Sequence, residues 1–277
     1  MKKILNSPMA ATAVFSLFYV LFANILGIFP YFVKFDSPVI NAIVSLITSV
    51  GASALVVLTA KKLLKDKYEI GLNSKNLKKG FLYASPVLII SVICIVFNVF
   101  VSHQSPVTNI SLILIAFLSA VTAGAGEELL NRGVYANIMA SKWAKTTKGV
   151  LLAAFVSALF FGLGHLANIY VVGKLTSQLT WQIIYATALG CGFAAAYIRT
   201  KNLWGCIVVH TLFDFLSLLF VTGESTQESL KTVLSAPMST EALILNIITC
   251  IVGFGMMFFL LRPSKLEEIK KLWITEE

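Results

Sequence analysis

Eight apolar runs, each about 20 residues long, divide this chain, and a helix needs a run of that length to cross a lipid bilayer. Lipid offers the backbone no hydrogen-bond partner, so only helices and closed barrels span it. The runs are continuously apolar rather than alternating, which excludes a barrel. We therefore predict an all-α, polytopic membrane protein with about eight transmembrane helices. The predicted spans are roughly Met9–Phe29, Val39–Ala60, Phe81–Ser102, Val107–Leu129, Gly149–Val172, Leu179–Ile198, Leu203–Thr222 and Ala242–Leu261.

The composition indicates the same class of protein. Hydrophobic residues make up 57% of the chain and charged residues only 13%, whereas a soluble domain carries about 25% charged residues. No repeat or soluble segment interrupts the pattern, so we expect one integral membrane domain over residues 1–277, ending in a cytoplasmic tail at 262–277. The first apolar run is longer than that of a signal peptide and lacks a small-x-small cleavage site, so we interpret it as a retained span.

The basic residues predict how the protein lies in the membrane. The net charge is +9, and with the N-terminus in the cytoplasm only Lys34, Lys174 and Lys231 of the 22 basic residues fall outside. Cytoplasmic loops carry such an excess, so we place both termini in the cytoplasm. The charge then reflects a partnership with the lipid bilayer, including its anionic head groups, and not nucleic-acid binding. The four cysteines lie in apolar runs without a CxxC pair, which favours buried packing over disulfides or a zinc cluster.

Ionisable residues within spans are costly and therefore mark functional sites. Here they are Glu127 and Glu128 near the predicted end of the fourth span, His165 in the fifth, and His210 and Asp214 in the seventh. Three separate helices thus each offer polar groups to an otherwise apolar bundle.

The spacing of these residues assigns them to helix faces. Glu128 and Arg132 are four residues apart, so their side chains can form an ion pair. Glu127 points about 100° away from its neighbour and is free to face a cavity. His210 and Asp214 are also four residues apart and share one face of their helix.

Small residues lie beside two of the polar positions, at Ala123–Gly126 and at Gly162 and Gly164, and we expect other helices to approach closely there. The predicted depths of the site residues along their helices do not agree with one another. At 1.5 Å per residue, His165 lies about 24 Å into its predicted helix, whereas Glu127 lies near the end of its own. We therefore expect a strongly tilted helix, or a fifth helix that begins outside the bilayer.

One carboxylate with two imidazoles suits hydrolysis, because the carboxylate can take a proton from water while an imidazole positions water or stabilises an oxyanion. The same groups can bind zinc with one open position, which would activate a bound water. A proton or ion path through the carboxylates is a third interpretation, although the outer halves of the spans are apolar and no inverted repeat is evident. The set common to the first two interpretations is Glu127, His165, His210 and Asp214.

Three motifs connect these residues to a known family. EELLNR fits EExxxR, FGLGH from Phe161 to His165 fits FxxxH, and HTLFD from His210 to Asp214 fits HxxxN/D. In this order on separate spans, the chain resembles the CPBP family, which contains the type II CAAX prenyl endopeptidases and the bacterial bacteriocin-processing Abi proteases. The resemblance covers about residues 107–222. It implies an eight-span intramembrane endopeptidase.

The resemblance also implies roles for single residues. Glu127 would activate water, His165 would assist it, and His210 with Asp214 would stabilise the oxyanion or bind a metal, while Glu128, Arg132 and Phe161 would support the structure. Both a zinc metalloprotease and a metal-free glutamate protease remain open. Asp214 stands where eukaryotic members tend to have Asn; an aspartate suits zinc, but without a metal it must be protonated to donate to an oxyanion.

The resemblance extends to substrate and location. We expect a bacterial plasma-membrane protein whose pocket opens to the cytoplasmic side, and whose substrate is a membrane-associated peptide or a lipidated protein. The alternative is a non-catalytic bacteriocin self-immunity or scaffold protein with the same fold. The oligomeric state is left open.

Overall fold

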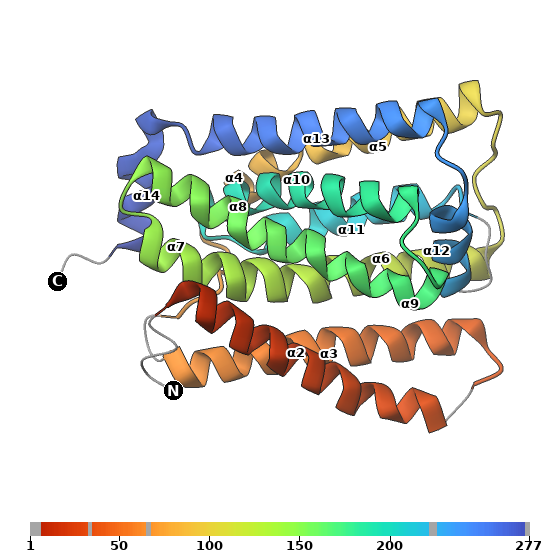
Figure 1. Cartoon of the computed structure of the whole chain (residues 1–277), viewed down its shortest axis with the longest axis horizontal. Helices are drawn as coiled ribbons and strands as arrows, with labels where there is room; N and C mark the ends of the chain where they lie inside the picture. The colour runs from red at the N-terminus through yellow and green to blue at the C-terminus, as the bar shows by residue number, and fades with distance from the viewer. Residues whose placement is uncertain (1–6, 33–34, 65–67, 222–225, 275–277) are drawn as a thin grey trace.

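A computed structural model describes residues 7–32, 35–64, 68–221 and 226–274, and this part of the chain is helical without a strand (Figure 1). The prediction of an all-α polytopic membrane fold is confirmed. The helices are α2 (Pro8–Phe32), α3 (Pro38–Leu64), α4 (Leu77–Ala84), α5 (Val87–Val96), η2 (Phe97–Val101), α6 (Ile110–Leu130), η3 (Asn131–Ala136), α7 (Asn137–Trp143), α8 (Thr147–Gly164), η4 (His165–Asn168), α9 (Ile169–Val172), α10 (Ser177–Thr200), α11 (Trp204–Leu218), α12 (Thr226–Ser235), α13 (Thr240–Leu260), η5 (Pro263–Lys265) and α14 (Leu266–Trp273).

All eight predicted segments contain helix, but not all are full-length spans. Within the described residues, 6 helices are long and apolar enough to cross a membrane, and the pair Leu77–Ala84 and Val87–Val101, bent by 44°, makes up to 7. The bend falls at Pro86, because proline cannot donate the helical hydrogen bond. The seventh predicted span forms only the shorter apolar helix α11. The count of eight complete spans is therefore not confirmed.

The helix that carries the two glutamates is longer than predicted. It continues from Ile110 to Trp143 as one stretch of 34 residues, passing through the π-helix η3 into α7. Residues 131–140 are all buried. Arg132 therefore lies buried within a continuous helix, because its charge is paired with Glu128 and does not end the helix.

The turn between α7 and α8 resolves the difference in depth. α8 starts at Thr147, after Thr146, whose side chain accepts a hydrogen bond from the backbone N–H of Gly149 at 3.0 Å. It then runs back along α7 and η3. Since the first arm of this helical hairpin extends far beyond Glu127, His165 returns to nearly the same level on the second arm.

Two glycines bring the site helices together. A Cβ atom at Gly124 would lie 2.8 Å from the backbone nitrogen of Thr211, so α6 and α11 cross in backbone contact. At Gly162 the added atom would lie 2.7 Å from the carbonyl oxygen of Ile183, which brings α8 against α10. The expectation of close approach is wrong for Gly164, where an added Cβ atom would meet nothing within 4 Å.

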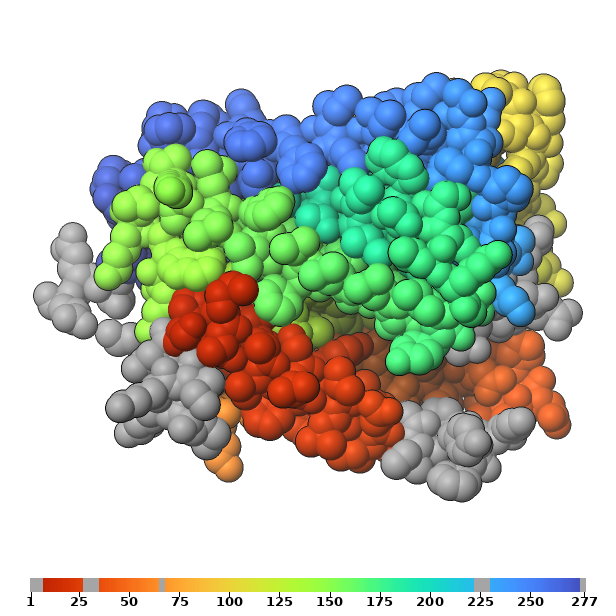
Figure 2. All heavy atoms as spheres, in the orientation of Figure 1, coloured from red at the N-terminus to blue at the C-terminus, as the bar shows by residue number. Residues whose placement is uncertain are grey.

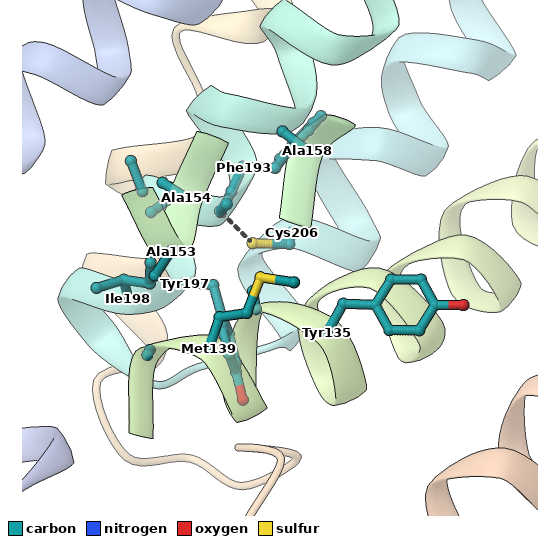
Figure 3. Packing of buried hydrophobic residues seen from close by; sticks show 14 of the residues in the cluster. Tyr135, Met139, Ala153, Ala154, Ala158, Phe193, Tyr197, Ile198 and Cys206 are labelled. Atoms are coloured by element: carbon teal, nitrogen blue, oxygen red, sulfur yellow. Dashed lines mark hydrogen bonds between the residues drawn. The ribbon is translucent and has the colours of Figure 1, made fainter. Parts of the chain in front are cut away.

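The core lies at one end of the molecule, which we call the basic end because it carries the lysine-rich loops after α3, α7 and α10. α10 runs through its centre between α8 and α13 (Figure 1). All residues from 186 to 200 of α10 are buried, while most residues from 177 to 185 are partly exposed. Figure 3 shows the packing there, where Phe193 and Tyr197 meet Met139 and Cys206.

Two further segments cover the basic end. α14 packs on α10, and the Trp273 indole N–H donates to the Ile198 carbonyl at 2.7 Å. Segment 68–76 crosses the helix ends, held by buried amides: the Asn137 side chain donates to the Glu69 carbonyl at 2.7 Å, and the Asn202 side chain donates to the Asn73 carbonyl at 2.9 Å. The predicted C-terminal tail, residues 262–277, thus includes a packed helix, α14.

Candidate active site

The centre of the site is a buried chain of three charged or polar groups. Arg132 donates to Oε1 of Glu128 at 2.8 Å, one turn away on the same helix. Nδ1 of His210 lies 2.8 Å from that same oxygen. An arginine and a carboxylate inside a membrane protein are tolerable only when they neutralise each other, since isolated buried charges are strongly disfavoured. Glu128 therefore connects the fourth predicted span to the seventh.

Two aromatic rings enclose the arginine. The guanidinium carbon of Arg132 lies 4.8 Å from the ring centre of Phe161 and 5.3 Å from that of Phe193, both within the range of a cation–π interaction. The same guanidinium donates to the Gly190 carbonyl oxygen at 3.2 Å. Arg132 is thereby fixed between α6, α8 and α10, and it holds Glu128 in turn.

The second nitrogen of His210 faces two other carboxylates. Its Nε2 lies 3.5 Å from Asp214 and 3.9 Å from Glu127. The Glu127 side chain is 37% exposed, whereas that of Glu128 is 0% exposed. Adjacent glutamates on one helix therefore have opposite surroundings, because one points into the packed core and the other into open space, as the helical geometry predicts.

His165 joins the site through Phe161. Its Nδ1 lies 3.1 Å from the Phe161 carbonyl oxygen, and its ring meets the Phe161 ring edge-on at 5.1 Å. The same aromatic ring also meets the imidazole of His210, with the ring centres 6.1 Å apart and the planes perpendicular. Both imidazoles thus lie near one phenylalanine ring, and all predicted site residues gather in one region of the bundle.

The predicted zinc ligands are not assembled as a metal centre. In the part of the chain that the structure describes, no group of three His, Cys, Asp or Glu side chains is arranged to hold a metal ion. Nε2 of His210 lies near two carboxylates, whereas the contacts of His165 are with the ring and the carbonyl oxygen of Phe161. The residues as placed do not form the proposed ligand set, and zinc stays a prediction.

Sequence reasoning found the pairs Glu128–Arg132 and His210–Asp214 but missed what joins them. Glu128 and His210 are 82 positions apart, so no spacing rule relates them. Phe193 was also missed, because an aromatic residue in an apolar helix gives no local sign that it faces a charge. The nearby small residues Gly190 and Gly192 were the available hint, since they mark close packing.

The surroundings of the site differ between its two sides. Toward the basic end the helices are closely packed, while Glu127 and Asp214 retain exposed surface on the other side. The surface between α2 and α8 is hollowed in Figure 2. This packing does not support the expectation that the pocket opens to the cytoplasmic side.

Comparison with known proteins identifies one family. Residues 109–216 match the sequence model of the family described as type II CAAX prenyl endopeptidase Rce1-like. The matched segment runs from the N-cap of α6 into α11 and contains every residue of the site described above. Searches of curated proteins and of solved structures gave no significant match.

Proposed function

We propose that this chain, whose residues 109–216 match the Rce1-like family model, is a CPBP-family intramembrane endopeptidase that uses Glu127 to activate water against a peptide bond of a membrane-associated peptide or protein. The match supports protease activity in general. The observation that carries the mechanism is the contrast between exposed Glu127 and buried Glu128 beside a single imidazole. Only the exposed carboxylate can meet water and substrate.

Hydrolysis then proceeds by general base catalysis. Glu127 takes one proton as the water oxygen bonds to the carbonyl carbon, and the carbonyl oxygen becomes an oxyanion. When the tetrahedral intermediate collapses, the C–N bond breaks and the protonated Glu127 returns that proton to the leaving nitrogen. The products are a carboxylic acid and an amine, which exchange a proton to become a carboxylate and an ammonium, and Glu127 is restored as a carboxylate.

His210 is placed to stabilise the oxyanion. Its Nδ1 is committed to Glu128, so Nε2 is the atom available to the substrate. A fixed donor in a water-poor site stabilises developing negative charge more strongly than water does. Asp214, 3.5 Å from Nε2, supports the charged form of the imidazole. In this role it needs no proton of its own, in contrast to an aspartate that donates directly to the oxyanion.

His165 completes the set from the α8 side. The Phe161 carbonyl oxygen accepts a hydrogen bond from Nδ1 in the tautomer that leaves Nε2 as a base or acceptor. Such a backbone contact fixes the direction in which the ring points. We propose that His165 positions the attacking water or the substrate carbonyl. Zinc assistance would require the side chains to rearrange around an ion, and the metal-free mechanism needs no such change.

The proposed role of Glu127 is tested by comparing proteolysis by the parent chain with proteolysis by one isosteric variant. Glu127→Gln keeps size and polarity but removes the base, and activity should fall by about 10²- to 10⁴-fold. Because the substrate is not known, new peptide N-termini are mapped by mass spectrometry in membranes of cells that carry the parent or the variant. Glu267→Gln, on the exposed surface of α14, is the matched control. Identical sets of N-termini in the parent and Glu127→Gln would instead favour the self-immunity or scaffold alternative.

A further inference from the structure

The direction from which a substrate reaches the pocket follows from which part of the helix bundle is closely packed. On every long helix around the site, buried residues concentrate in the half that leads to the basic end. In α3 they lie mainly at 52–60, in α6 to α7 at 124–140, in α10 at 186–200, and in α11 at 205–210. The opposite halves of these helices are mostly half-buried or exposed.

The catalytic groups lie at the boundary between these halves. Arg132 and Glu128 are on the packed side and are almost completely buried. Glu127 and Asp214 follow on the open side, with side chains 37% and 25% exposed. α6 runs toward the basic end and α11 runs away from it. On both helices the buried group lies nearer the basic end than the exposed group, so the two helices indicate the same open side.

A route from the basic end would have to cross the core. Tyr135, Met139 and Tyr197 belong to the buried cluster on this side of the site (Figure 3), and none of them is more than 4% exposed. Segment 68–76 then covers the helix ends, and the Tyr68 hydroxyl donates to the Gly133 carbonyl. Close packing of this kind does not admit an extended peptide without large rearrangement.

The first helix leaves the opposite side open. α2 contacts η3 and α7 near the basic end and packs on α3. Toward its other end it diverges from α8 and α9, as Figure 1 shows, and Figure 2 shows the hollow between them. The space between α2 and α8 therefore widens away from the basic end and leads toward α6, which carries Glu127.

From this packing we propose that the catalytic pocket is entered from the half of the membrane opposite the basic loops. With the basic end in the cytoplasm, the substrate is an exported or membrane-inserted peptide whose scissile bond is presented from the extracytoplasmic half, and not a protein held on the cytoplasmic surface. The statement that the pocket binds a peptide substrate rests on the proposed protease function. The direction of access does not.

Side-specific thiol labelling tests the direction. Glu127→Cys places a thiol in the open space, and a charged, membrane-impermeant methanethiosulfonate is added to right-side-out or inside-out vesicles. Lys142→Cys at the basic end and Lys174→Cys at the other end are exposed positions that report which face the reagent reaches. The thiol at position 127 should react from the Lys174 face at least 10-fold faster than from the Lys142 face.

Matched controls make the result decisive. Glu128→Cys, at the adjacent buried position, should react only after denaturation, and the parent chain gives the background from its native cysteines. Asp214→Cys is an independent reporter on α11 in case the first variant fails to fold. Labelling from the Lys142 face, or from neither face, would overturn the inference. Since no cleavage is measured, this result is separate from the fate of the protease proposal.

Discussion

The imidazole of His210 stacks on the ring of Phe193, with the ring centres 5.3 Å apart and the planes inclined by 24°. Phe193 also lies 5.3 Å from the guanidinium carbon of Arg132. One buried ring thus lies against both side chains that contact Oε1 of Glu128. This relationship assigns Phe193 as a positioning residue that fixes the direction of Nε2, although it belongs to none of the three sequence motifs.

Phe193→Leu should lower kcat by about 5- to 10-fold while KM changes little, because a lost cation–π contact is worth about 1 kcal/mol and acts on the orientation of His210. Phe15→Leu is the control, since Phe15 is equally buried but packs on Phe18 in α2. Both variants should lose similar thermal stability. Equal kcat values for the two would show that Phe193 only fills space.

Gly124→Ala should destabilise the protein and reduce its activity, because the new methyl group would press on the backbone of Thr211 and push α11 away from α6. Overpacking of this kind costs about 1–3 kcal/mol. Gly164→Ala, where the added atom meets nothing within 4 Å, should leave the melting temperature unchanged or slightly higher. Thermal unfolding in detergent measures both, and an unchanged melting temperature in Gly124→Ala would contradict the close crossing.

Metal removal should leave proteolysis intact if Glu127 acts alone. The purified protein is analysed for zinc and assayed before and after dialysis against a chelator, with cleavage of the peptide identified from membranes as the readout. One zinc per chain, lost together with activity and restored by added zinc, would contradict the glutamate mechanism. In that case His210, Asp214 and Glu127 would be the ligands to test first.

The docking of α14 should depend on acid pH. Hydrogen bonds from Lys265 and Arg199 lower the pKa of Glu268 to about 2. A carboxyl whose folded pKa is depressed contributes stability above its ordinary pKa, and this stability is lost as pH falls through the folded value. The contribution is modest because Glu268 is largely exposed. Trp273 fluorescence, obtained as the difference from Trp273→Phe, should change between about pH 4.5 and 2, and Glu268→Gln should remove that change.

Much of this architecture was predictable from patterns that act within one helix. Apolar length identified the eight helical segments, and the four-residue spacing paired Glu128 with Arg132 and His210 with Asp214. Glycines at 124 and 162 marked two of the crossings. Each of these features depends on neighbours in sequence, where helix geometry alone sets which side chains meet.

The remaining features depend on contacts between distant segments. The end of the fourth span was misjudged because Arg132 looks like a loop residue until Glu128 and Phe161 are seen to neutralise and enclose it. The depth of His165 depended on that same error. Which side of the site is packed could not be read from composition, since lipid-facing and core-facing residues are equally apolar in a membrane protein.

The wide turn η3 imposes a constraint on chain length that composition does not reveal. Residues Asn131–Ala136 form a π-helix, and the carbonyl of Gly133 within it accepts the hydroxyl of Tyr68. A π-helical turn holds one residue more than the α-helical register needs, so a one-residue deletion is absorbed there when the turn returns to α geometry. A deletion in the regular α-helix on either side would instead rotate Asn137 by about 100° relative to Glu127 and turn it away from segment 68–76. The turn therefore sets the phase between Glu127 and Asn137 in the continuous helix from Ile110 to Trp143.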